Sequence, residues 1–289
     1  MRNDDLKGKS LSSIHHSSSI IYFPMDFLTE IMSLKRERLE HSKKAQAVEA
    51  LRARIDDARR DSKPHALRAA LSNPDRVNII AEFKRASPSK GVIRADAAPS
   101  RIARDYESGG AAAISVLTEE DRFQGSLDDL RAIRATVKIP VLRKDFIFDE
   151  YQLYESAAAG ADALLLIVAA LDDEKLARLR RMTEDELNMD ALVEVHTKEE
   201  MHRAVGAGAA LIGVNNRDLR TFKVSLEVSA ELAQDAPEGS LLVAESGISS
   251  VDDLRTLRSI GYKGFLIGET LMRAAEPEKA LRKLLFRKA

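Results

Sequence analysis

Apolar residues follow two alternating patterns along most of this chain. From residue 77 onward, eight short runs rich in Val, Ile, Leu and Ala alternate with longer charged stretches whose apolar positions have helical spacing. The runs cover residues 77–83, 111–117, 140–144, 163–168, 191–195, 210–214, 241–245 and 264–268. Nearly continuous apolar runs are typical of parallel strands covered on both faces. The pattern therefore predicts an α/β fold with a parallel sheet of eight strands.

A glycine precedes every second apolar run. Gly110, Gly160, Gly208 and Gly261 stand about 50 residues apart, each just before a run. Glycine suits the residue after a helix because it adopts the left-handed conformation at little cost. Repeats of two βα units predict a (β/α)8 TIM barrel. A doubly wound open sheet is the alternative, but it usually has fewer strands and a glycine-rich first turn.

The residues before the first run divide into two segments. Residues 1–24 are Ser-rich and have neither a helical period nor the apolar stretch of a secretory signal, so we expect a disordered tail. Residues 25–76 carry apolar positions at helical spacing, which predicts an N-terminal helical extension with breaks near Pro64 and Pro74. Residues 77–289 are expected to form the barrel and, with the extension, one catalytic domain.

Composition and charge exclude several classes of protein. The chain has 289 residues, 44% of them hydrophobic, which is enough to bury a substantial core. Its 45 Lys and Arg nearly cancel its 46 Asp and Glu, which argues against nucleic acid or an anionic membrane as a partner. The absence of Cys excludes disulfides and thiolate metal sites and fits a reducing compartment such as the cytoplasm. The longest apolar run, 163–171, is too short to span a bilayer.

Ionisable and amide side chains stand at the carboxyl ends of several expected strands, where TIM barrels carry their catalytic residues. They are Glu82 and Lys84, Lys144, Glu194, and Asn215 with Arg217. Because side chains alternate along a strand, Glu82 and Lys84 should point to the same side. Each residue alone could form a structural ion pair, but buried charges at equivalent ends of different strands are costly without a function. Lysines and carboxylates that converge in a partly desolvated mouth could transfer protons.

The last two runs end in small residues and lead quickly into helices. Ser246 and Gly247 follow the seventh run, and Gly268 and Glu269 follow the eighth. Small residues expose backbone N–H groups near helix N-termini, which bind phosphate, and phosphate sites are frequent at this place in TIM barrels. We therefore expect a phosphate site here, with two ordinary tight turns as the alternative.

The histidines suggest no metal site. His196 follows Glu194 by two residues, but one His and one Glu make a poor metal site, so we interpret His196 as a solvated loop residue. The sequence contains no phosphate-binding P-loop, zinc motif or serine nucleophile elbow. These features give no indication of a metal site.

Ordered motifs extend from about residue 25 to the C-terminus. They are residues 80–91 (IAEFKRASPSKG), 117–120, 123–126, 142–146, 192–195, 212–218, 244–248 and 266–272. In sequence and order they resemble the indole-3-glycerol phosphate synthase family of tryptophan biosynthesis. Residues 1–24 fall outside the resemblance.

The resemblance implies a carbon–carbon lyase that closes an indole ring without a cofactor or metal. Its substrate, 1-(2-carboxyphenylamino)-1-deoxy-D-ribulose 5-phosphate, loses CO2 and water to give indole-3-glycerol phosphate. Lys144 would protonate the substrate carbonyl as the aromatic carbon attacks it, and Glu194 would take part in the later proton removal and dehydration. Glu82 and Asn215 would orient and assist. Lys84 would meet the substrate carboxylate, and the division of acid steps between the two lysines stays open.

The resemblance also implies binding residues. The substrate would contact Ser87, Pro88, Phe123, Phe146, Leu165, Arg217 and Leu266, with the two Phe rings against the anthranilate ring. The phosphate would be held by Ser246, Gly247, Gly268 and Glu269. Many relatives have Ser at position 269, so Glu269 would act through its backbone N–H, or Thr270 would supply the hydroxyl. In the family an N-terminal extension packs near the active-site mouth.

Two other functions stay open at this stage. One is a related phosphosugar isomerase barrel such as phosphoribosylanthranilate isomerase, which would be expected to use a different acid–base pair. The other is a catalytically inactive barrel retained for binding within a multienzyme complex, against which intact Lys144 and Glu194 argue. The sequence leaves association with other enzymes of the tryptophan pathway open, and it predicts neither a nucleic-acid nor a membrane partner.

Overall fold

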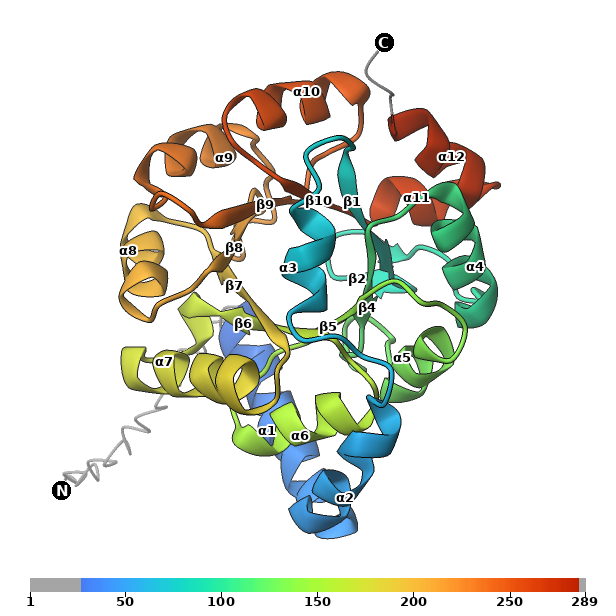
Figure 1. Ribbon diagram of the computed structural model, residues 1–289, viewed down its shortest axis with the longest axis vertical. Coiled ribbons are helices and arrows are strands. Elements are labelled where there is room, and N and C mark those ends of the chain that lie inside the picture. The colour runs from blue at the N-terminus through green and yellow to red at the C-terminus, as the bar shows by residue number, and fades with distance from the viewer. Residues whose placement is uncertain (1–26, 286–289) are drawn as a thin grey trace, which may run out of the picture.

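Eight parallel strands close into a single barrel in the computed structural model, which describes residues 27–285 (Figure 1). In chain order they are β1 (Asn78–Phe83), β4 (Ala113–Leu117), β5 (Val141–Lys144), β6 (Ala163–Ile167), β7 (Asp190–Val195), β8 (Leu211–Asn215), β9 (Leu241–Glu245) and β10 (Gly264–Ile267). Pairing of Asn78 with Gly264 aligns β1 with β10 and closes the barrel. The expected TIM barrel is confirmed, and every strand begins and ends within two residues of its predicted bounds.

Helices surround the barrel on its outside (Figure 1). They are α4 (Pro99–Gly109), α5 (Leu127–Arg134), α6 (Glu150–Ala158), α7 (Asp173–Arg181), α8 (Lys198–Gly206), α9 (Glu227–Leu232), α10 (Val251–Ser259), α11 (Glu269–Arg273) and α12 (Pro277–Leu284). A short hairpin, β2 (Ala86–Ser87) and β3 (Gly91–Val92), follows β1, and single turns η1 (Val168–Ala170), η2 (Met182–Glu186) and η3 (Ala233–Asp235) interrupt other connections. No helix within residues 27–285 is long and apolar enough to cross a membrane.

The four glycines that revealed the repeat adopt the conformation expected of them. The φ angles of Gly110, Gly160, Gly208 and Gly261 are 95°, 86°, 78° and 106°, all in the left-handed region. Each residue ends a helical segment and turns the chain into the next strand. Because only glycine takes this conformation at little cost, these positions set the connections into alternate strands.

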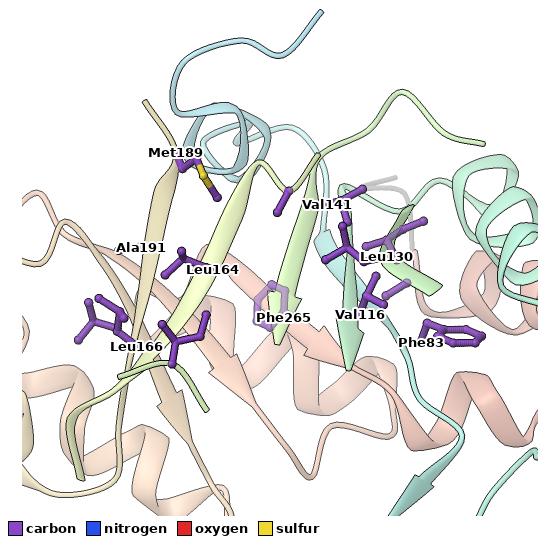
Figure 2. Close-up of a cluster of buried hydrophobic side chains, with 14 of the residues drawn as sticks. Phe83, Val116, Leu130, Val141, Leu164, Leu166, Met189, Ala191 and Phe265 are labelled. Atoms are coloured by element: carbon purple, nitrogen blue, oxygen red, sulfur yellow. The ribbon is translucent and has the colours of Figure 1, made fainter. Parts of the chain in front are cut away.

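Side chains alternate between the two faces of the barrel wall. Those that point outward pack beneath the helices, as Figure 2 shows for Phe83, Val116, Val141, Leu164, Leu166 and Phe265. Those that point inward fill the barrel with Ile80, Leu142, Leu165, Leu192, Leu211 and Val243. The apolar interior ends near the carboxyl ends of the strands, where the inward positions become charged or polar. The strand period therefore gathers Glu82, Lys144, Glu194 and Glu245 at the carboxyl end of the inner wall. At the amino end, the buried Asp190 of β7 pairs with Arg68, which precedes the barrel in the chain, at 2.6 Å.

Three helices precede the barrel and contact both of its ends. They are α1 (Phe27–Ala45), α2 (Val48–Ala58) and α3 (Ala66–Leu71), so the breaks expected near Pro64 and Pro74 are confirmed, and a further break between α1 and α2 was not foreseen. In Figure 1, α3 crosses the centre of the barrel. Its Leu67 and Leu71 are fully buried in the interior cluster, and the carbonyl of Leu71 accepts a hydrogen bond from Asn78 at the start of β1.

The expectation that the extension packs near the mouth is therefore right for α1 and wrong for α3. The reason is that the amino ends of the strands leave apolar side chains uncovered, and the two leucines of α3 cover them.

A buried ion cluster attaches α1 to the barrel. Lys35 Nζ lies 2.9 Å from Asp145 Oδ2 and 3.0 Å from Glu120 Oε2, and Arg143 Nη2 lies 2.9 Å from the same oxygen of Asp145. Burial opposes ionisation of Asp145, but Lys35 and Arg143 outweigh it and lower the pKa of Asp145 from 3.8 to about 2. Since Asp145 directly follows Lys144, this cluster links α1 to the wall that carries the candidate acid.

Removing the buried lysine should destabilise the protein more than removing an exposed one from the same helix. Lys35→Ala leaves Asp145 buried with one cation fewer, and breaking such a pair typically costs about 3–5 kcal/mol. Lys43→Ala breaks a half-exposed pair with Asp149, which is usually worth less than about 1 kcal/mol. Urea denaturation at neutral pH measures both. Equal losses in the two variants would contradict the structural role of Lys35.

The loss of unfolding free energy caused by Lys35→Ala should also depend on pH. A carboxyl whose folded pKa lies below its usual 3.8 stabilises the fold above that value, and this stabilisation is lost as the pH falls toward the folded pKa. The difference in unfolding free energy between wild type and Lys35→Ala should therefore narrow below about pH 4. A difference that stayed constant into that range would show that Asp145 is not the group that Lys35 stabilises.

Candidate active site

A cavity of about 750 Å³ opens at the carboxyl ends of the barrel strands. Every residue that the sequence singled out lines it: Glu82, Lys84, Lys144, Glu194 and Asn215; Ser87, Pro88, Phe123, Phe146, Leu165, Arg217 and Leu266; Ser246, Gly247, Gly268 and Glu269. Thr270 is part of the same wall. Residues from all parts of the barrel sequence thus converge on one site.

Two lysines and three carboxylates meet at the base of this cavity. Lys144 Nζ lies 2.8 Å from Glu194 Oε2 and 3.0 Å from Glu245 Oε2. Lys84 Nζ lies 2.6 Å from Glu82 Oε2, as expected if both side chains point inward from the same strand end. The three carboxylates are almost completely buried, whereas 15% of the Lys144 side chain and 16% of the Lys84 side chain are exposed to the cavity. The ammonium groups are therefore the charges that a bound molecule could reach.

Pairing with carboxylates controls the ionisation of Lys144 and Glu194. Burial disfavours the charged form of Lys144, but the carboxylates of Glu194, Glu245 and Glu82 outweigh it and raise the lysine pKa above 10.5. Burial likewise disfavours the Glu194 carboxylate, but Lys144, His196 and a hydrogen bond from Asn215 lower its pKa below 4.5. At neutral pH the site therefore holds a proton on Lys144 and an ionised acceptor on Glu194.

Glu245 is a member of this cluster that the sequence analysis missed. We considered the end of the seventh run only for phosphate binding. Residues 241, 243 and 245 share the inward face of β9, and that parity was the available signal. Burial raises the pKa of Glu245 above 4.5, the Lys144 ammonium partly offsets this, and the Glu194 carboxylate adds to the rise. Neither carboxylate oxygen accepts a well-directed hydrogen bond from the described residues, so its ionised form depends on Lys144.

Two glycines leave room for these buried carboxylates. A Cβ at Gly213 would lie 2.1 Å from Glu245 Oε1, and one at Gly268 would lie 2.2 Å from Glu82 Oε2. We expected Gly268 to permit close approach of a phosphate. Its position shows a further requirement, because any side chain there would displace Glu82.

Aromatic rings form one wall of the cavity. The ring centres of Phe123 and Phe146 lie 6.5 Å apart, and Phe27 of α1 contacts Phe146 edge-on at 6.3 Å. Phe222 contacts Phe27 at 5.3 Å. Phe27 and Phe222 were not foreseen, since Phe27 belonged to the apolar face of a helix and Phe222 to an irregular stretch. Only the tertiary structure brings these two rings to the mouth.

Backbone N–H groups point to a candidate phosphate site after β9 and β10. Among the described residues, the N–H groups of Gly247, Ile248 and Gly268 donate no hydrogen bond within the protein. The Glu269 carboxylate lies 3.0 Å from Arg273 and 3.9 Å from Lys90, two cations that the sequence analysis did not single out. These cations offset the negative charge of Glu269 beside a site expected to bind an anion.

The interpretation of His196 as a solvated residue is wrong. Its side chain is 11% exposed and lies between two carboxylates, Glu194 and Glu200. Glu200 follows one helical turn later on α8 and accepts a hydrogen bond from the His196 backbone N–H, which folds the ring inward. The His196 ring is therefore buried because Glu200, in the first turn of the helix after β7, holds it in place.

Comparison with known proteins assigns a family by sequence. Residues 28–284 match the family model of indole-3-glycerol phosphate synthase. The indole-3-glycerol phosphate synthase of Carboxydothermus hydrogenoformans is 48% identical over 263 residues, which cover 90% of this chain and 99% of that protein. The enzyme of the same name from Paracidovorax citrulli is 46% identical over 265 residues, with coverage of 90% and 98%.

Solved structures agree with the fold at low sequence identity. The 3-hexulose-6-phosphate synthase of Salmonella typhimurium has a TM-score of 0.57 and 13% identity, and the alignment covers 72% of this chain and 96% of that chain. Thiamine phosphate pyrophosphorylase from Pyrococcus furiosus has a TM-score of 0.54 and 18% identity, with coverage of 72% and 93%. At this identity the likeness supports the barrel alone.

A Cβ at Gly213 should disturb both stability and the site. Gly213→Ala must shift Glu245 or Leu192, and such overpacking costs about 1–3 kcal/mol. Gly206→Ala is the matched control, because that helical glycine has open space around it and alanine there should stabilise by about 0.5–1 kcal/mol. Thermal unfolding and turnover measure the pair. Equal Tm and kcat in the two variants would show that Glu245 does not need the space.

Proposed function

The chain belongs to the indole-3-glycerol phosphate synthase family, and we propose that the lysines and carboxylates at its barrel mouth carry out the reaction of that family. The enzyme converts 1-(2-carboxyphenylamino)-1-deoxy-D-ribulose 5-phosphate into indole-3-glycerol phosphate, CO2 and water. The observation that carries the proposal is the pairing of Lys144 with Glu194 at 2.8 Å, which sets a proton donor beside a proton acceptor in a cavity lined with aromatic rings.

Ring closure requires an acid. The aromatic carbon that bears the carboxylate attacks the substrate carbonyl, and the carbonyl oxygen becomes an alkoxide that must take a proton. Lys144 holds its proton at neutral pH and reaches the cavity, so it is placed to donate as the oxygen becomes basic. Before donation its charge also stabilises the developing oxyanion.

Decarboxylation needs orientation more than proton transfer. The C–C bond to the carboxylate breaks, CO2 leaves, and the electron pair returns to the ring and restores its aromaticity. Lys84, 2.6 Å from Glu82, is the cation proposed to hold the carboxylate until it leaves. Glu82 in turn fixes the Lys84 ammonium.

Dehydration completes the indole. The hydroxyl formed from the carbonyl leaves as water with a proton from a lysine, and a base removes a proton from the adjacent carbon to form the ring double bond. Glu194 is ionised at neutral pH and is the proposed base. Asn215, the last residue of β8, lies beside Glu194, helps to lower its pKa, and is proposed to orient it.

The remaining walls fit the two ends of the substrate. Phe123 and Phe146 offer apolar faces to the anthranilate ring, together with the aliphatic side chains of Leu165 and Leu266. Ser87, Pro88 and Arg217 come from the loops above the strands, where the Arg217 guanidinium donates to Ser89 Oγ at 3.2 Å. The unpaired N–H groups at Gly247 and Gly268, with Ser246 and the backbone of Glu269, are proposed to bind the phosphate.

The family assignment decides between the functions that the sequence left open. The relatives are indole-3-glycerol phosphate synthases, not isomerases, and the paired lysines and carboxylates argue against an inactive barrel. The substrate is a small molecule. A cytoplasmic location, and any association with other enzymes of the tryptophan pathway, belong to the proposal and are supported by the absence of cysteine and by the biosynthetic family.

Replacing Lys144 tests the acid role. Lys144→Ala should lower kcat by about 10²- to 10⁴-fold, the usual worth of a general acid. It should also lower Tm, because Glu194 and Glu245 would stay buried without their shared cation.

Lys144→Arg separates the two effects. It keeps a positive charge between the carboxylates but replaces the ammonium with a guanidinium that does not give up its proton. Tm should stay closer to that of wild type while kcat remains low. If Lys144→Arg kept more than about a tenth of wild-type kcat, Lys144 would not be the acid.

A pair of glycine variants tests the phosphate site. Gly247 and Gly239 have φ angles of 83° and 86°, so alanine is equally strained at both. A Cβ at Gly247 would lie 2.6 Å from Val224 and must shift the loop, whereas Gly239 has open space around it. Gly247→Ala should raise KM for the phosphorylated substrate by about tenfold or more, as expected for loss of one charge-assisted contact, and Gly239→Ala should not.

A substrate that lacks the phosphate provides the second arm of this test. Wild type should bind it poorly, and Gly247→Ala should weaken its binding much less than that of the phosphorylated form. Equal binding of both substrates by wild type would remove this loop from phosphate recognition.

A further inference from the structure

His196 occupies a defined position between two carboxylates. It follows the last residue of β7, and its imidazole Nδ1 lies 3.1 Å from Glu200 Oε2. The same Glu200 oxygen accepts the His196 backbone N–H at 2.7 Å, so Glu200 holds both the ring and the chain of this residue. On its other side, Nε2 lies 3.4 Å from Glu194 Oε1. The buried Nε2 makes no hydrogen bond with good geometry to any described residue and is directed at Glu194.

The two oxygens of Glu194 face different cations. Oε2 lies against Lys144 and Oε1 against His196. Rotation of the carboxylate would give up one of these contacts. His196 therefore restricts the orientation in which Glu194 presents an oxygen to the cavity.

The base of the cavity holds more carboxyl groups than ammonium groups. Glu82, Glu194 and Glu245 face Lys84 and Lys144, and burial and the nearby Glu194 raise the pKa of Glu245 to about 7. Once Glu245 ionises, the carboxylates outnumber the ammonium groups by one. Buried like charges are costly unless a counter-charge is near. An imidazolium at His196 is placed to supply it.

We propose that His196 is a positioning residue for the reaction: held by Glu200, its imidazolium orients Glu194 and keeps it ionised, so that Glu194 can accept a proton beside Lys144. The inference rests on the proposed role of Glu194 and adds a second pair of residues behind it. His196 is not among the residues that line the cavity, and it acts through Glu194, which is.

The surroundings of His196 favour its protonated form. Burial lowers the pKa of the imidazole, but Glu200, Glu194 and Glu245 outweigh it and raise the pKa above 6.5. The cations of α8 are paired elsewhere, Lys198 with Asp235 of η3 and Arg203 with Asp173 of α7, while Glu199 and His202 of the same helix lie exposed at the surface. Lys144 is separated from the ring by the Glu194 carboxylate. The positive charge should therefore persist through neutral pH and be lost as the pH rises above the folded pKa.

The test compares kcat and KM across pH for three variants. His196→Gln keeps a neutral hydrogen-bond donor but removes the charge, and it should lower kcat on the order of tenfold with little change in KM, a part of the 10² to 10⁴ that acid–base catalysis is worth. Loss of one cation should raise the pKa of Glu194. The acidic limb of the profile of kcat against pH should therefore move to higher pH by about one pH unit. Glu200→Gln should shift the acid limb in the same direction, because the imidazole then loses its charged partner.

His202→Gln is the matched control. His202 lies exposed on α8, six residues after His196, and carries the same substitution without a carboxylate contact in the site. Its kcat, KM and acid limb should equal those of wild type. Thermal unfolding of each variant at neutral pH shows whether it is folded. If His196→Gln does not fold, the shift of the acid limb in Glu200→Gln, which leaves the imidazole in place, tests the proposal instead.

Glu194→Gln distinguishes failure of this inference from failure of the proposed function. If Glu194→Gln lost kcat while folded His196→Gln and Glu200→Gln kept both wild-type kcat and an unmoved acid limb, the role of His196 would be refuted and that of Glu194 kept. If Glu194→Gln itself kept wild-type kcat, the proposed base and this inference would both fail. A fall in kcat of His196→Gln with an unmoved acid limb would indicate packing alone and would also overturn the proposal.

Discussion

The architecture of the site depends on keeping three carboxylates ionisable inside a barrel whose wall is otherwise apolar. Ionised carboxylates are stable there only if cations lie within contact distance, and Lys144, shared by Glu194 and Glu245, is the central one. The rest of the mouth is built around this requirement. Gly213 and Gly268 leave space for two of the carboxylates, and the strand period places all three carboxylates at the same end of the barrel. Catalytic capacity and electrostatic stability thus depend on the same side chains.

The N-terminal helices join this site to the fold as a whole. α3 closes the apolar end of the barrel with Leu67 and Leu71, while α1 brings Phe27 to the cavity and Lys35 to Asp145, the residue after Lys144. A lysine buried in a helix is retained here because it has two carboxylate partners. The strand that carries the proposed acid is therefore held from inside by Glu194 and Glu245 and from outside by α1.

The sequence predicted correctly those features that depend on the residues of a single strand or on the glycine before it. Continuous apolar runs and a repeated glycine located the barrel, and the positions at strand ends located Glu82, Lys84, Lys144, Glu194 and Asn215. It failed where a contact joins distant segments. Phe27 and Phe222 meet only in the folded chain, Lys35 resembled any other lysine on an amphipathic helix, and His196 is buried because Glu200 folds it inward. Glu245 also stands at a strand end, in the inward register of Leu241 and Val243, but the small residues that follow it indicated phosphate binding and drew the prediction away from its carboxylate.

The charge balance at the mouth can be measured directly by titrating the carboxyl groups of the wild-type protein. Carbon-13 NMR of glutamate-labelled enzyme, with resonances assigned through Glu194→Gln and Glu245→Gln, reports the protonation of each side chain. Lys144 and His196 should keep Glu194 ionised to a pH well below 4.5, while burial should keep a proton on Glu245 to a pH above 4.5. Titration of both residues together near 4.5, as in a solvated peptide, would contradict the account.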